Sequence, residues 1–421
     1  MTDVRSRAGA VAAEVADRLA IPDDVAERAR RADRSGRRTW SPGSLHAGHP
    51  GIAALHATLG RPRRARGHLA AAARSAPTPA TVQALLPAAF LHRAAHGDGY
   101  AQLVRQAETA TLLAARAALQ DARPEPGLAM AEYDAVTGLS ALGRQLLELS
   151  ADPAADPDVP AVLGQVLERL VQITQPVVVH GAEVPGWWCS PDRYALDLDR
   201  ERYPLGDLNV GLAHGAAGPL ALLAIARLQG LDVPGGRAAI DRLARWLVGC
   251  RAAGDNGPTW PGRVDFRVEA GLQPPPPPTG RAAWCYGTAG VARALQLAGA
   301  ALDDPELTAL AVDGIRGVLA GGPERAGLTD LSLCHGEAGL LHIAHRMTAG
   351  DPAFEPAIDA LTERIIARFD PAVPFGFRHG DPVTDEPGLL YGAAGIALAL
   401  AGVAQPPPEG RYAWDAVLLL S

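Results

Sequence analysis

A short motif that the chain repeats carries cysteines and histidines of the kind that bind metals. The string (His/Tyr)-Gly-x-Ala-Gly occurs four times, at residues 214–218, 286–290, 335–339 and 391–395. Cys285 directly precedes the second copy and Cys334 the third, while His214 opens the first copy. If equivalent positions of the repeat face one centre, two thiols and an imidazole would form a Cys₂His set there. Such a set leaves the fourth tetrahedral position of Zn²⁺ open, as catalytic zinc sites do.

The same residue types have a simpler interpretation. Cysteine without a partner is often only a small buried side chain, and we expect this of Cys189 and Cys250, which lie outside the motif. The histidines without a motif role, which we expect in the core or on the surface, are His46, His49, His56, His342 and His345. From spacing alone, the main alternative to a zinc site is therefore that these side chains are buried in the core with their hydrogen bonds satisfied.

The elements that position the motif are predicted to be helices. An apolar run with helical spacing follows each copy, and each run is too long for a buried strand. The first glycine of the motif permits a sharp turn into the helix. The alanine and the second glycine are small enough for neighbouring backbones to approach closely. More polar amphipathic segments at residues 237–248 and 304–319 are expected to form outer helices.

The spacing of the copies predicts one large repetitive fold. The four copies lie 72, 49 and 56 residues apart, and weaker copies stand at residues 48–51 and 138–143. This spacing fits one helical hairpin per repeat, so we expect an all-α structure, an α/α toroid of about seven hairpins with inner and outer helices. No series of β-branched strands alternates with the helices, which disfavours a parallel sheet.

Proline-rich interruptions are predicted to be loops within one domain. They stand at residues 153–160, 274–278 and 406–408, and none separates parts of different composition. We therefore expect a single domain over residues 1–421.

Composition excludes several classes of chemistry and of partner. The chain has 48% hydrophobic and 20% charged residues, which is typical of a folded protein. All 39 basic residues are arginine, so P-loop phosphate binding, Schiff bases and lysine bases are excluded. Residues 1–75 hold 14 Arg against 7 acidic residues, but a single aromatic residue, Trp40, is not the interleaving of arginine and aromatic residues that supports nucleic-acid binding. We interpret them as solvated helix faces and expect no nucleic-acid partner.

Neither a signal peptide nor a membrane-spanning segment is predicted from the sequence. The first 20 residues lack the apolar core of a signal peptide. The longest uncharged apolar stretch, residues 389–404, has 16 residues and three glycines, so we expect no transmembrane segment. Four widely spaced cysteines do not make a disulfide framework. The chain is therefore predicted to be cytoplasmic.

Taken together, the motifs resemble the lanthionine synthetase C-like family, whose members close thioether rings in lanthipeptides. The most specific segments are Gly-Leu-Ala-His-Gly at His214, Trp-Cys-Tyr-Gly at Cys285 and Leu-Cys-His-Gly at Cys334, in that order. Arg281, four residues before Cys285, and Asp134 in Tyr-Asp-Ala-Val-Thr-Gly-Leu-Ser also match. The resemblance extends from about residue 48 to about residue 391. It implies an α/α toroid.

The resemblance also implies a cofactor and a reaction. One Zn²⁺ per chain would be held by Cys285, Cys334 and His335. The substrate would be a precursor peptide with a leader, in which Ser and Thr are already dehydrated. Its cysteine thiol, with a pKa of about 8.5 in water, would be deprotonated on zinc. With the substrate thiolate bound, two cysteine thiolates, one imidazole and Zn²⁺ would give the site a net charge of −1. This negative charge would keep the substrate sulfur nucleophilic. It would add to dehydroalanine or dehydrobutyrine, and an enolate would develop.

Four further residues have roles that the resemblance implies. His214 is the candidate acid that protonates the α-carbon, because imidazole titrates near neutral pH. Asp134 would orient His214, and Arg281 would stabilise the enolate or orient the peptide. Tyr286 either hydrogen-bonds at the site or has a structural role, as Tyr391 in the fourth copy suggests. For Asp134 and Arg281 the alternative is an ion pair that braces helices.

Several expectations concern partners and rival functions. No dehydratase or kinase-like region precedes the cyclase segment in these residues, so we expect a stand-alone cyclase served by a separate dehydratase. Trp187, Trp188 and the loop of residues 274–278 are candidates to line the edge of the substrate cleft.

A non-catalytic zinc scaffold that binds modified peptide or a dehydratase is an alternative to the cyclase function. An α/α-toroid glycosidase would need two carboxylates, and the candidates are Asp381, Asp385 and Glu386. That last reading leaves the cysteines and histidines unexplained.

Overall fold

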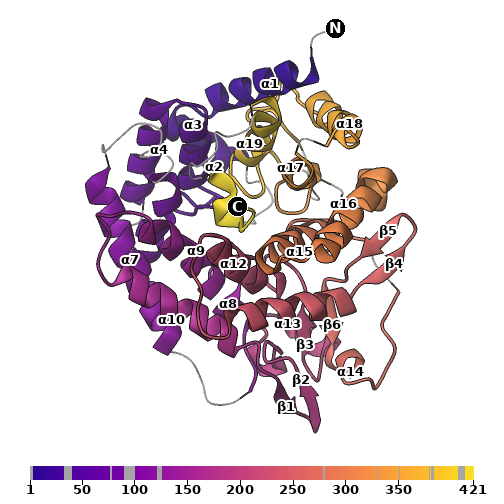
Figure 1. The fold of residues 1–421 in the computed structure, drawn as a ribbon. Coiled ribbons are helices and arrows are strands. Elements are labelled where there is room, and N and C mark those ends of the chain that lie inside the picture. The colour runs from indigo at the N-terminus through magenta and orange to yellow at the C-terminus, as the bar shows by residue number, and fades with distance from the viewer. Residues whose placement is uncertain are drawn as a thin grey trace. The chain divides into compact units, whose positions relative to one another are not determined.

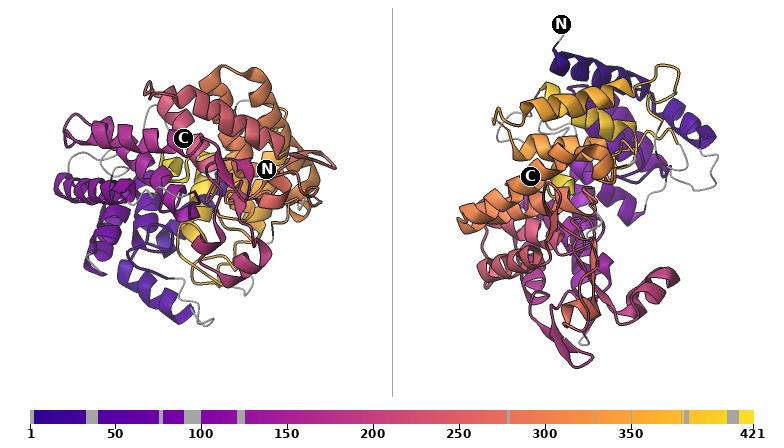
Figure 2. Two further views of the ribbon diagram at one scale, coloured as in Figure 1. Left: turned by 90° about the horizontal axis from the view of Figure 1, so that it is seen from below. Right: turned by 90° about the vertical axis from the view of Figure 1, so that its right-hand side faces the viewer.

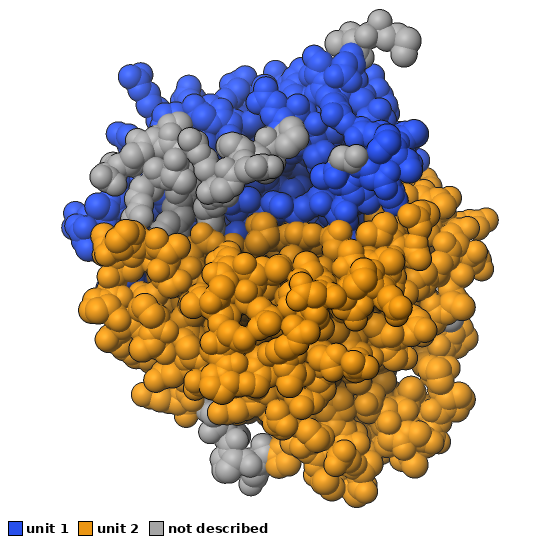
Figure 3. All heavy atoms as spheres, in the orientation of Figure 1, with its two compact units in different colours: residues 1–111, 328–416 blue, residues 112–327, 417–421 orange. Residues whose placement is uncertain are grey.

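A computed structural model gives the structure of the chain. It describes residues 3–32, 40–75, 78–89, 100–120, 126–277, 280–328, 330–349, 351–378, 380, 384–405 and 413–421. Asp381, Pro278 and residues 406–408, which were named above, lie outside the described residues. The chain divides into two compact units: unit 1 is residues 1–111 and 328–416, and unit 2 is residues 112–327 and 417–421 (Figure 3).

The described part of unit 1 is helical. Its helices are α1 (Val4–Arg18), α2 (Pro22–Ala32), α3 (His49–Thr58), α4 (Pro62–Ser75), α5 (Pro79–Ala84), the first half of α7 (Ala101–Gln120), α17 (Glu337–Met347), α18 (Glu355–Ala367), α19 (Ala393–Ala404) and most of the 3₁₀ helix η2 (Trp414–Leu418). Segments far apart in the sequence lie side by side here, because α1 packs against α19 and α18 (Figure 1, Figure 2). The N-terminal helices therefore help to build the core around the last motif.

Unit 2 combines helices with three short β-ribbons. Its helices are α8 (Met130–Tyr133), α9 (Leu139–Ser150), α10 (Val159–Gln172), η1 (Pro191–Arg193), α11 (Asp197–Arg202), α12 (Ala217–Leu228), α13 (Gly236–Gly249), α14 (Phe266–Glu269), α15 (Thr288–Leu302) and α16 (Pro305–Arg325). The antiparallel pairs are β1 (Val177–Val179) with β2 (Ala182–Val184), β3 (Asp207–Asn209) with β6 (Arg263–Asp265), and β4 (Ala252–Gly254) with β5 (Gly257–Thr259). These strands were not predicted, because three residues are too few to show alternation.

The four helices that begin in the copies of the motif are largely buried. α12, α15, α17 and α19 each begin inside a copy of the motif, and nearly every residue of α12 and α19 is buried. Within unit 2, α12 packs on α15, and within unit 1, α17 packs on α19. The polar segments predicted at residues 237–248 and 304–319 are the half-buried helices α13 and α16. The weak copies at residues 48–51 and 138–143 open α3 and α9.

One backbone hydrogen bond recurs in all four motif loops. In each copy the N–H that follows the first glycine donates to the carbonyl seven residues earlier. The four pairs are Ala216 to Asn209 at 2.9 Å, Thr288 to Arg281 at 2.9 Å, Glu337 to Asp330 at 3.0 Å and Ala393 to Glu386 at 2.7 Å. The loops therefore present equivalent residues in equivalent places.

The glycines of the motif serve this loop. Gly287 has a φ of 97°, and a Cβ there would collide with the carbonyl oxygen of Arg281. A Cβ on Gly290 would collide with the carbonyl oxygen of Trp284. The second glycine thus makes room chiefly for the motif's own loop, whereas the sequence had suggested crowding between neighbouring helices. Among the described residues, no helix is both long enough and apolar enough to span a membrane.

Candidate metal centre

Cys285 lies in the loop that enters α15 in unit 2. Its side chain is buried, and its carbonyl oxygen accepts a hydrogen bond from the N–H of Ala213 at 3.3 Å. The preceding residue, Trp284, is fully buried, and its indole Nε1 donates to the carbonyl oxygen of Leu418 at 3.0 Å. These contacts fix the backbone on both sides of the thiol.

Cys334 and His335 lie in the loop that enters α17 in unit 1. Cys334 is buried, and its N–H donates to the carbonyl oxygen of Leu390 at 3.0 Å. His335 is half-buried, and its Nε2 lies 2.8 Å from Oδ2 of the buried Asp330. The centroid of its ring lies 5.7 Å from that of Tyr391. One loop therefore offers a thiol and an oriented imidazole in adjacent residues.

Three described side chains form a group that could hold a metal ion. The ligand atoms of Cys285, Cys334 and His335 all lie within 4.8 Å of one another. Two thiols and one imidazole are donors that Zn²⁺ prefers, and three protein ligands leave a position open. The residues present therefore fit a metal centre with room for a substrate ligand.

His214 and Asp134 are in direct contact within unit 2. The Nδ1 of His214 lies 2.7 Å from Oδ2 of Asp134. The Asp134 side chain is 2% exposed, and its other oxygen accepts the N–H groups of residues 136, 137 and 138, where α9 begins. The His214 side chain is 38% exposed. Asp134 is thus held by the backbone and holds the imidazole, while Nε2 of His214 remains on the other side of the ring.

Tyr286 lies next to His214, with ring centroids 6.2 Å apart. Its hydroxyl accepts a hydrogen bond from Nδ2 of Asn209 at 3.3 Å. Burial raises the pKa of Tyr286 above its usual value, although the bond from Asn209 opposes this. The hydroxyl therefore stays protonated near neutral pH, and its own proton can be donated to a ligand.

Arg281 opens the same loop as Cys285. Its side chain is exposed, and among the described residues its guanidinium forms no ion pair. The alternative of a helix-bracing ion pair is therefore not observed for Arg281. The partner of Asp134 is the imidazole of His214.

Sequence reasoning missed two residues that contact the candidate site. Asn209 bonds Tyr286, and Asp330 bonds His335. A signal was present, because both stand five residues before the His or Tyr of a motif. Arg281 and Glu386 hold the same position in the other two copies. A polar residue in this place of every copy could have pointed to them.

Other candidates lie elsewhere in the fold. Cys189 is buried beside Tyr133, and Cys250 is half-buried at the end of α13. The expectation that Trp187 and Trp188 edge a cleft is wrong. Both are buried, since the ring of Trp187 packs edge-on against Trp246 and the indole of Trp188 donates to the carbonyl oxygen of residue 205 at 3.2 Å.

The glycosidase candidates have local roles. Oδ2 of Asp385 accepts the N–H of Phe375 at 3.0 Å, and burial raises its pKa to about 6. Glu386 accepts a hydrogen bond from the hydroxyl of Thr384 at 3.2 Å.

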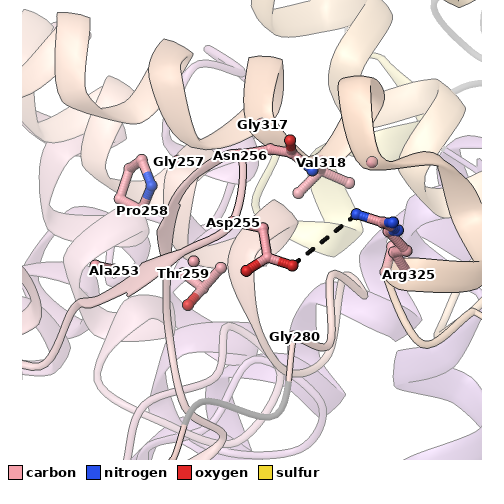
Figure 4. Close-up of a pocket in the computed structure, with 13 residues that line it drawn as sticks. Ala253, Asp255, Asn256, Gly257, Pro258, Thr259, Gly280, Gly317, Val318 and Arg325 are labelled. Atoms are coloured by element: carbon pink, nitrogen blue, oxygen red, sulfur yellow. Dashed lines mark ion pairs between the residues drawn. The ribbon is translucent and has the colours of Figure 1, made fainter.

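A cavity of about 200 Å³ in unit 2 lies apart from these residues. It is lined by the β4–β5 hairpin and α16, and Asp255 and Arg325 form an ion pair of 3.9 Å across it (Figure 4). A Cβ on Gly317 would lie 2.5 Å from the carbonyl oxygen of Asn256, so packing of the hairpin explains this glycine. None of the predicted site residues lines the cavity.

Comparisons with known proteins agree with the motifs. The sequence profile of the family described as lanthionine synthetase C-like protein matches residues 39–419. The nisin biosynthesis protein NisC of Lactococcus lactis subsp. lactis is 26% identical over 214 residues, which are 50% of this chain and 48% of NisC. The match thus spans about half the length of that curated relative.

A solved structure shares the fold. The structure named nisin cyclase superposes with a TM-score of 0.75 at 20% identity, covering 94% of this chain and 97% of that one. This likeness confirms the predicted helical toroid class.

Proposed function

Because the chain belongs to the lanthionine synthetase C-like protein family, we propose that it is a zinc-dependent lanthipeptide cyclase. It adds cysteine thiols of a dehydrated precursor peptide to dehydroalanine and dehydrobutyrine, and forms lanthionine and methyllanthionine rings. The observation that carries the proposal is the group formed by Cys285, Cys334 and His335. The names of NisC and nisin cyclase support the same substrate class.

The proposed ligands define what the metal contributes. One Zn²⁺ held by Cys285, Cys334 and His335 supplies a Lewis acid that keeps a substrate thiol deprotonated at neutral pH. The two cysteines are buried, so the surroundings exclude much of the water that would compete with the substrate sulfur. Other residues of the chain then have to stabilise the negative charge that develops on the peptide and protonate it.

Atom balance requires a proton at the α-carbon of the dehydro residue. The thiol gives up its proton to solvent, a bond forms between sulfur and the β-carbon, and the former double-bond electrons become an enolate; His214 is reprotonated from solvent after each turnover. His214 supplies the proton from Nε2, because its Nδ1 is engaged by Asp134. The Asp134 carboxylate stabilises the imidazolium that must exist before transfer. It also fixes the direction of the ring.

The enolate oxygen needs hydrogen-bond donors while it carries charge. The guanidinium of Arg281 is exposed and carries a permanent charge, so it can meet this oxygen or orient the peptide. The hydroxyl of Tyr286 can donate as well, since Asn209 occupies it as an acceptor. Both residues flank Cys285 in one loop.

Further parts of the proposal concern context. The substrate carries a leader, and a separate dehydratase prepares it. The cytoplasm is the proposed location, because thiolate ligands need a reducing compartment. We take residues 1–421 as a single domain, since the family profile runs over residues 39–419 and so includes parts of both units. A non-catalytic zinc scaffold would keep the ligands without forming thioethers.

The experiment that tests the proposal counts thiols on a dehydrated precursor peptide. The peptide is incubated with the full chain and Zn²⁺, its remaining thiols are alkylated, and mass spectrometry counts the alkyl groups. We expect the count to fall as rings close. A count that stays unchanged while the chain holds zinc would contradict the cyclase and favour the scaffold.

A further inference from the structure

We infer that Asp330 is the positioning residue of His335 and that it commits this imidazole to bind the metal through Nδ1. This inference rests on the proposed function, because it concerns one of the three proposed zinc ligands. It adds a residue and a specific ligand atom to that site.

The contact that carries the inference is short and local. Oδ2 of Asp330 lies 2.8 Å from Nε2 of His335. Oδ1 of the same carboxylate accepts the N–H of Ser332 at 2.7 Å, and the carbonyl oxygen of Asp330 accepts the N–H of Glu337 at 3.0 Å. The side chain of Asp330 is 5% exposed, whereas that of His335 is 34% exposed. The carboxylate is therefore fixed by the loop, and the imidazole is held by the carboxylate.

The geometry of this contact decides which ring nitrogen of His335 faces the carboxylate. Oδ1 of Asp330 accepts the backbone N–H of Ser332, and Oδ2 faces Nε2 of His335, so the loop presents this side chain as a hydrogen-bond acceptor. An ionised carboxylate only accepts hydrogen bonds, so Nε2 of His335 must be the donor. In the neutral imidazole the lone pair then belongs to the other nitrogen, Nδ1. A metal ligand needs that lone pair.

Such an arrangement benefits a metal site in two ways. A carboxylate on the distal nitrogen fixes the orientation of the ring and raises the basicity of the ligating nitrogen. Loss of such partners typically costs about 10- to 100-fold in metal affinity. Asp330 would therefore influence zinc binding without touching zinc.

The repeat supplies a matched control position. Glu386 stands in the fourth copy where Asp330 stands in the third, and both accept the same backbone hydrogen bond. The motif residue of the fourth copy is Tyr391, which is not a proposed ligand. An acidic residue in this loop position is thus paired with a proposed metal ligand only in the third copy.

The test uses the full chain and compares Asp330→Asn with Glu386→Gln. Asparagine can still accept the N–H of Ser332 through its carbonyl oxygen, but it removes the charge that faces His335. Zinc affinity is measured by competition with a chromophoric chelator, and thermal unfolding of the metal-free chains checks that each variant folds. We expect affinity about 10- to 100-fold weaker for Asp330→Asn and close to the wild-type value for Glu386→Gln. Equal affinities for Asp330→Asn and wild type would overturn the inference.

A second measurement is made on the wild-type chain itself. Nitrogen-15 NMR of histidine-labelled wild-type chain reports which nitrogen of His335 carries hydrogen, with the signals assigned by their loss in His335→Asn. We expect Nε2–H in the metal-free chain and zinc on Nδ1 after loading. Hydrogen on Nδ1, or zinc on Nε2, would overturn the inference while leaving the metal centre intact. A wild-type chain that shows Nε2–H but binds no zinc would instead contradict the proposed function.

Discussion

His214 and His335 occupy the same position in two copies of one motif, yet they bind their carboxylate partners through opposite ring nitrogens. His214 uses Nδ1 toward Asp134, and His335 uses Nε2 toward Asp330. The partners also come from different places, because Asp330 belongs to the loop of its own motif and Asp134 precedes another helix. The repeat therefore supplies two equivalent imidazoles. The carboxylates contact different ring nitrogens, so the nitrogen on the other side of the ring is Nε2 in His214 and Nδ1 in His335. This difference fits the proposal that one is a ligand and the other an acid.

The first prediction concerns the ligands. Cys285→Ala or Cys334→Ala should lose the single bound zinc, because each removes one of only three protein ligands. Metal content after dialysis, measured by atomic emission, gives the answer. Cys250→Ala is the matched control, since Cys250 is half-buried outside the motifs, and it should keep one zinc per chain. Full occupancy in both ligand variants would show that the assignment is wrong.

A second prediction concerns Asp134. Asp134→Asn keeps an oxygen for the three N–H groups at the start of α9 but removes the charge beside His214. Zinc content should be unchanged, while cyclisation should slow by up to about 10²- to 10⁴-fold, the usual worth of general acid catalysis. Single-turnover rates on a dehydrated peptide, with zinc measured on the same samples, test this. A wild-type rate would exclude a role for the carboxylate in proton delivery.

Acid should destabilise unit 1 through three histidines that the proposed mechanism does not use. His49, His56 and His68 are buried against one another, with the Nδ1 atoms of His49 and His68 3.0 Å apart. Burial lowers the pKa of His49 and His56 to about 4, and burial with the neighbouring imidazoles lowers that of His68 to about 3. The charged groups that face the cluster are Asp17, Asp23, Arg61, Arg64 and Arg74.

The sign of this effect follows from proton linkage. Between about pH 6.5 and pH 4 the unfolded chain binds protons that the folded chain excludes, so stability falls as pH falls. Each histidine contributes up to about 1.4 kcal/mol per pH unit in that window. Urea unfolding at several pH values should show this slope, and His68→Gln should reduce it by roughly one third of the three-histidine contribution. A slope that His68→Gln leaves unchanged would show that other groups cause the acid sensitivity.

Motif spacing predicted the elements well, because the physics of the motif is local. The glycines of each copy fix a turn, and the apolar run that follows must be buried, so the sequence alone indicated where α12, α15, α17 and α19 begin. Partners that depend on loop geometry were harder to find. Asp330 and Asn209 have no motif of their own. Their contacts with His335 and Tyr286 exist only in the folded loop, where the backbone brings them next to these residues.

The wrong expectation has a physical cause of the same kind. Trp187 and Trp188 stand beside glycine and proline, which suggested an exposed loop. The ring of Trp187 packs against Trp246, which comes from α13 about sixty residues later in the chain. Packing between distant segments is not visible in a local pattern. The short ribbons were missed for a similar reason, since β3 pairs with β6 more than fifty residues away.

The last prediction separates proton delivery from metal activation by means of the two motif histidines. His214→Asn should keep zinc, because His214 is not among the three grouped ligands, but ring closure should slow by about 10²- to 10⁴-fold. His335→Asn should lose zinc and therefore fail earlier, at activation of the thiol. Zinc content and cyclisation rate are measured for both variants on the same dehydrated peptide, with addition of excess Zn²⁺ as the control. Excess zinc should partly restore the cyclisation rate of His335→Asn by mass action and leave that of His214→Asn unchanged.

If zinc loss accounted fully for the defect of His214→Asn, that residue would be a ligand or a support of the fold. A zinc-replete His214→Asn chain that cyclised at the wild-type rate would remove its role as the acid.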